Sequence, residues 1–127
     1  MGQRMLRLAV AVAVATALIG LGQLGAADDK PKYDIKTIMA KAHKGKPPLC
    51  AKVVKGEASD AEKKELYEYY VALAANKCPK GDEADWKKRT EEMVAAAKKI
   101  ADGSKDKADL AALSKAIYCK GCHDAHR

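Results

Sequence analysis

The chain has 127 residues, which suits one domain, and it carries a formal net charge of +7 with 48% hydrophobic residues. Its lysines alternate with aspartate and glutamate, and no basic cluster is interleaved with aromatic residues, which argues against nucleic-acid binding. Mild basicity suits an acidic partner protein instead.

Residues 1–27 are typical of a targeting segment rather than of the fold. Arg4 and Arg7 form a basic start, an apolar stretch runs over 6–19, and small residues at the end form a cleavage site. This predicts a signal peptide and export to the periplasm, with a mature domain at 28–127 that carries a charge of +5. An uncleaved anchor stays an alternative because the apolar stretch is long, but we expect no stable membrane insertion of the mature chain.

The rest of the chain is predicted to be helical throughout, because no alternating run of β-branched residues indicates a strand. A capping-box pattern at Ser59 and Glu62 and an acidic first turn near Asp82 mark two helix starts. Short links between amphipathic helices predict an all-α, antiparallel four-helix bundle. Its helices span about 34–44, 59–76, 82–103 and 106–125, with a short amphipathic turn at 49–54.

The last predicted helix contains the motif Cys119-Lys120-Gly121-Cys122-His123, a spacing typical of covalent haem attachment. Two cysteine sulfurs hold a c-type haem by thioether bonds, and the histidine binds its iron. At helical spacing the three side chains share one face. The alternatives are a local disulfide, a thioredoxin-type pair, which needs strands, or a zinc knuckle, which prefers a second close cysteine pair. Together with the export signal, the motif favours one covalent haem c.

The segment from Cys119 to Arg127, CKGCHDAHR, resembles the class II c-type cytochromes, the cytochrome c′ family. The resemblance implies a four-helix bundle with haem near its C-terminus, His123 as the proximal iron ligand and Arg127 as the basic residue beside it. His126 stands where the family has an aromatic residue, and we interpret it as a packing or solvent-facing residue near the haem edge. Tyr118 lies on an apolar stripe and is predicted to be a core residue.

Members of this family differ in the sixth iron ligand, for which the first helix offers Met39 and, one turn on, His43. A core methionine is the ordinary reading of Met39. In the low-spin members, however, a methionine of the first helix is the sixth ligand, and the position of Met39 matches it. We therefore favour Met39 as the ligand, with His43 or an open position as alternatives. A surface histidine near the helix end is the ordinary reading of His43.

Two functions follow from these alternatives. The first is a low-spin electron carrier that meets acidic redox partners as a monomer or homodimer. The second is a high-spin protein that binds nitric oxide or carbon monoxide. An enzyme is not expected, because oxidative haem chemistry needs distal acid and base groups and only His43 is available. Pairing of Cys50 with Cys78 is left open, since an oxidising compartment favours a disulfide but their places after different helices do not ensure it.

Overall fold

The computed structural model describes residues 30–127, so the predicted signal peptide at 1–27 lies outside the described residues. Within 30–127 the chain is helical and contains no strand, which confirms the all-α prediction for this part. None of its helices combines the length and apolar character needed to span a membrane. In chain order the elements are α1 (Ile35–Ile38), the π-helix η1 (Met39–His43), α2 (Leu49–Val54), α3 (Asp60–Ala75), α4 (Glu83–Ala101), α5 (Lys107–Ala116) and α6 (Cys119–His126).

Local hydrogen bonds explain where the long helices begin. The Ser59 hydroxyl accepts the amide of Glu62, and the Glu62 carboxylate accepts the amide of Ser59, which completes the predicted capping box of α3. Asp82 caps α4 and Asp106 caps α5 in a similar way, through carboxylates that accept first-turn amides. Each cap satisfies a backbone donor that the helix itself leaves unpaired. The helix starts expected near 59 and 82 are thereby confirmed.

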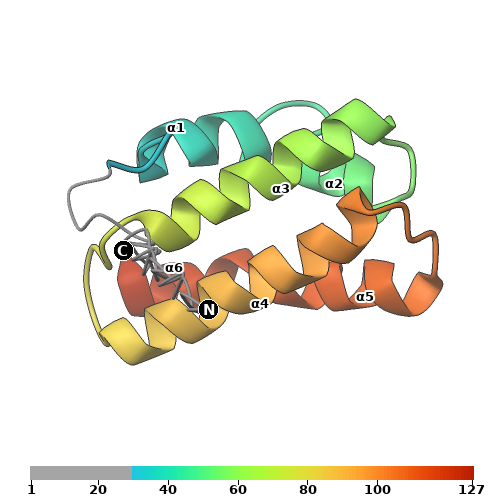
Figure 1. Ribbon diagram of the computed structural model, residues 1–127. Helices are drawn as coiled ribbons and strands as arrows, with labels where there is room; N and C mark the ends of the chain where they lie inside the picture. Colours follow the sequence, from blue (N-terminus) through green and yellow to red (C-terminus); the bar gives the residue numbers. More distant parts are fainter. Residues whose placement is uncertain (1–29) are drawn as a thin grey trace, which may run out of the picture.

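The helices pack in sequence order around one core (Figure 1). The longest pair, α3 and α4, run antiparallel, α5 returns along α4, and α1 and α2 cover α3. Short connections favour this antiparallel packing of neighbouring helices. The core residues with almost no exposed surface come from every layer: Ile38, Val53, Leu66, Tyr70, Leu73, Thr90, Ile100 and Leu113.

The predicted helix over 106–125 is wrong in one respect, because the chain breaks it at Ile117 and Tyr118. Ile117 has φ −88° and ψ 19°, and Tyr118 is extended at φ −60° and ψ 100° before α6 begins. Aromatic and β-branched residues favour a helix less than the lysines and alanines before them do. Gly121 leaves room for the bend, since a Cβ there would lie 2.8 Å from the ring of Tyr118. The break turns α6 toward the start of α4.

Candidate functional site

One cavity of about 650 Å³ lies between the first helical segment, α4 and the C-terminal residues. Its volume falls within the range of about 300–1,000 Å³ that is usual for small-molecule and cofactor sites. The wall is mainly apolar and aromatic, and none of the described residues that line it is aspartate or glutamate. Its apolar and aromatic lining residues are Ile35, Met39, Leu73, Pro79, Trp86, Met93, Ala116, Ile117 and Tyr118.

All five residues that the sequence singles out for a cofactor line this cavity. Cys119, Cys122, His123 and Arg127 come from the C-terminal residues, and Met39 comes from η1, far away in the sequence. If the cysteine motif were a chance match, there would be no reason for a methionine of the first helical segment to line the same cavity. The structure therefore brings the predicted attachment residues and the predicted opposite ligand to one apolar site.

The motif residues differ in how far they are covered. Cys119 and His123 are exposed, whereas Cys122 is half-buried, and burial raises the pKa of its thiol. The backbone amide of Arg127 donates to the carbonyl of His123 at 3.2 Å, which ties the chain end to the last turn of α6. Tyr118 was predicted to be a core residue, and this prediction is wrong, since the break before α6 leaves 61% of its surface exposed at the cavity.

The part of the cavity wall that η1 forms contains His43, which makes a hydrogen bond. His43 is half-buried rather than on the surface as expected, and its Nε2 lies 3.3 Å from the Tyr70 hydroxyl. Burial, with a smaller contribution from the nearby His123, lowers the pKa of His43 and keeps its ring neutral. Burial also raises the pKa of Tyr70 above its usual range, so this hydroxyl stays protonated. The Nε2 of His43 is thereby engaged in a hydrogen bond with a buried hydroxyl.

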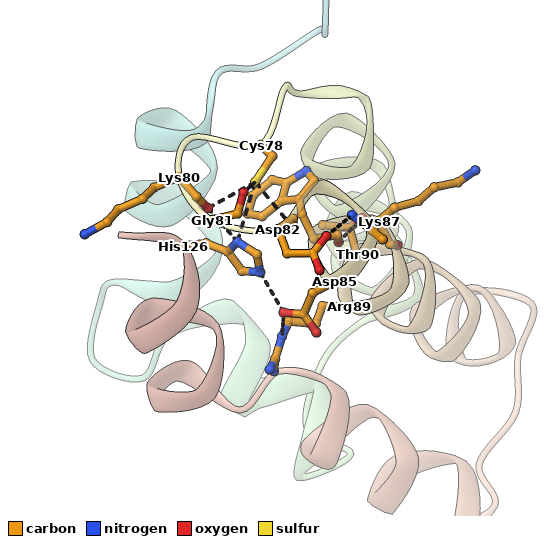
Figure 2. A network of polar contacts seen from close by, with 11 residues as sticks. Cys78, Lys80, Gly81, Asp82, Asp85, Lys87, Arg89, Thr90 and His126 are labelled. Carbon is orange, nitrogen blue, oxygen red and sulfur yellow. Dashed lines mark hydrogen bonds and ion pairs between the residues drawn. The ribbon is translucent and has the colours of Figure 1, made fainter.

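His126, interpreted from the sequence as a packing or solvent-facing residue, is buried with 4% of its surface exposed. Its Nδ1 lies 2.8 Å from the Lys80 carbonyl, and its Nε2 lies 2.9 Å from a carboxylate oxygen of Asp85 (Figure 2). The ring also meets Trp86 edge-on, with centroids 5.3 Å apart. No local signal predicts these contacts. The only hint is that a histidine replaces the aromatic residue that the family pattern has at this position.

The four cysteines are all free thiols in the described structure. Cys50 is buried in α2, whereas Cys78 follows α3 and lies 3.5 Å from Nδ1 of His126. No disulfide joins the two, which answers the pairing that the sequence leaves open. Within residues 30–127, no group of three or more histidine, cysteine, aspartate or glutamate side chains is placed to hold a metal ion.

Comparison with known proteins identifies no relative of this chain. No family model matches it, and no curated protein or solved structure is significantly similar to it.

Proposed function

We propose that this chain is an exported, monohaem c-type cytochrome that carries electrons in the periplasm, and that its helices form the four-helix bundle of the class II cytochromes. The four segments would be α1 with η1, α3, α4, and α5 with α6. One observation supports this most strongly: Cys119, Cys122, His123 and Met39 line a single apolar cavity. The motif alone is a sequence match, whereas its position at this cavity is an independent property of the fold.

The lining residues fit a covalently bound haem. The apolar wall suits a porphyrin face, and Cys119, Cys122 and His123 supply the thioether and axial donors that a c-type haem uses. Bound there, the haem would supply a reversible one-electron change at its iron. The protein contributes a low-dielectric pocket, because Trp86 and Met93 close the wall beside the motif and are each 5% exposed.

The two candidate ligands on η1 differ in availability, which favours Met39. The Nε2 of His43 shares a hydrogen bond with the buried Tyr70 hydroxyl, so iron binding by this nitrogen would leave that hydroxyl unpaired. Met39 is half-buried, lines the same cavity and offers a thioether sulfur that carries no proton. We therefore propose that Met39 and His123 would bind the haem iron, a combination that raises the potential of a cytochrome.

The cavity also suggests where a redox partner would bind. Among the described residues, no acidic side chain lines the cavity, whereas four exposed cations do: Lys36, Lys44, Lys80 and Arg127. A surface of one charge sign around a redox site steers partners of the opposite sign. An acidic redox partner is therefore part of the proposal. Its association should weaken as salt is added, since exposed charges are screened.

Two measurements test the proposal directly. The full chain is produced in a bacterial host with periplasmic haem attachment, and intact mass then reports whether one haem is bound covalently. An optical spectrum of the ferrous protein, recorded with and without carbon monoxide, reports the sixth ligand. We expect one haem and a low-spin spectrum that carbon monoxide changes only slowly. Absence of covalent haem would overturn the proposal, and rapid binding without loss of a protein ligand would favour the gas-binding alternative.

The ligand assignment has a matched control within the cavity. Met39→Leu keeps the volume but removes the sulfur, so we expect the ferrous haem to become high-spin. Met93→Leu makes the same change in a buried methionine of α4 that lines the same cavity, and it should leave the spectrum low-spin. If Met39→Leu stays low-spin while a His43→Leu variant becomes high-spin, the ligand is His43 instead.

A further inference from the structure

The helix that bears the motif has few means of holding its own position. The eight residues of α6 follow the break at Tyr118, and only one of them, His126, is buried. A helix this short is marginal by itself in water, so its orientation must come from tertiary contacts. Among the described elements, α6 packs chiefly on α4. The contacts of His126 therefore largely determine the position of α6.

His126 is held at both ring nitrogens. Nδ1 faces the Lys80 carbonyl, and Nε2 faces the Asp85 carboxylate, two groups that can only accept. The His126 ring therefore has an acceptor within hydrogen-bonding distance of each nitrogen, and its contact with the Asp85 carboxylate joins a buried side chain to a half-buried one. Arg89 donates to the same Asp85 oxygen at 2.6 Å, and these hydrogen bonds, that of Arg89 foremost, lower the pKa of the Asp85 carboxyl. Asp85 thus stays charged.

The neighbouring backbone is shaped to admit this contact. Gly81 has a positive φ of 86°, and a Cβ there would overlap the carbonyl oxygen of Ala125. The turn before α4 therefore approaches the backbone of α6 as closely as only glycine permits. Figure 2 shows the His126 ring pointing from α6 into this turn, between the Lys80 carbonyl and Asp85. Cys78 also adjoins the ring, with its sulfur 3.5 Å from Nδ1.

We propose that His126, clamped by Asp85 and the Lys80 carbonyl, is the positioning residue that sets the orientation of α6 and hence of the cofactor-binding residues. His126 follows Cys122 by four residues and His123 by three, so these side chains share one side of the helix. A rotation of α6 about its axis would move Cys122 and His123 together away from the cavity. The effect on a haem rests on the proposed function, whereas the clamp itself does not.

Amide hydrogen exchange of the exported full chain tests the clamp. His126→Phe keeps a ring against Trp86 but loses both hydrogen bonds, and Asp85→Asn keeps the shape but loses the charge. Losing a buried, charge-assisted hydrogen bond should speed exchange in α6 roughly tenfold or more. The matched control is Asp124→Asn, which removes a solvent-exposed carboxylate paired with Lys120 on the same helix and should leave exchange unchanged. Unchanged exchange in both clamp variants would overturn the inference.

Two further measurements separate positioning from a general loss of stability. The effect of the double variant His126→Phe with Asp85→Asn should be smaller than the two single effects combined, because both single changes remove the contact between His126 and Asp85. In the haem-loaded protein, both clamp variants should shift the reduction potential and the axial-ligand absorption bands, and Asp124→Asn should shift neither. If intact mass shows no haem, the proposed function fails, while the exchange measurement still decides the clamp. Unshifted haem properties with faster exchange would overturn the positioning role.

Discussion

The pair α3 and α4 and the terminal helix α6 are both helical but are stabilised in different ways. The pair shares a stripe of residues with almost no exposed surface, including Leu66, Tyr70 and Ile100, and each helix begins at a cap made by its own sequence. In contrast, α6 has no side-chain cap and only one buried residue. Local signals and apolar burial thus build the core, whereas a few long-range polar contacts place the helix that bears the motif.

A core truncation should have the largest effect and should affect the whole molecule. Leu66 is fully buried, so Leu66→Ala should lower the free energy of unfolding by about 3 kcal/mol through lost burial and the cavity left behind. Urea denaturation followed by circular dichroism measures this loss. Val71→Ala, at a position of α3 that is 42% exposed, is the control and should change stability by less than about 0.5 kcal/mol. Equal losses in the two variants would contradict the distinction between core and surface on α3.

A change at Gly81 should act on α6 more than on the core. In Gly81→Ala the new methyl group would overlap the Ala125 carbonyl, in addition to the strain of a positive φ. Gly103→Ala has a similar strain, with φ 107°, but meets no atom within 4 Å. We expect Gly81→Ala to cost about 1–3 kcal/mol more than this control, because overpacking adds to the strain. Denaturation of the two variants gives the difference, and equal costs would mean that the close approach to α6 is not maintained.

Removal of a helix cap should have a smaller, local effect. Ser59→Ala deletes the hydroxyl that accepts the Glu62 amide and should lower the free energy of unfolding by about 1 kcal/mol. Ser114→Ala, at an exposed position inside α5, provides the control and should be close to neutral. Thermal unfolding compares the two. A neutral Ser59→Ala would show that burial alone, without the cap, sets where α3 begins.

The smallest effect should appear as a dependence on pH. The hydrogen bonds from Arg89 and then His126 lower the pKa of the Asp85 carboxyl below its ordinary value of 3.8. Near that value the unfolded chain binds more protons than the folded one, so the contribution of Asp85 is complete above it and is lost as pH falls through the folded pKa. Acid titration of stability should therefore be less steep for Asp85→Asn than for the native chain. If the stability of both proteins falls equally steeply at low pH, the hydrogen bonds proposed to lower the pKa of Asp85 are contradicted.

The sequence predicts those features of the fold that depend on near neighbours. Ser59, Glu62 and Asp82 indicate helix starts because their hydrogen bonds reach only two or three residues along the chain. The haem attachment that the motif at Cys119 predicts also rests on spacing alone, and it stays a prediction. The place of His126 depends instead on Asp85, which is 41 residues away in the sequence. The orientation of α6 therefore could not be predicted from periodicity.

The same long separation determines the order in which the site can be made. The contacts that receive His126 come from Lys80, Gly81 and Asp85, all of which leave the ribosome before α6 does. Because synthesis proceeds from the N-terminus, the residues that receive α6 are made before α6 itself. The helix that bears the motif can therefore dock onto a turn that already exists, and the cysteine motif becomes fixed only after that turn has formed.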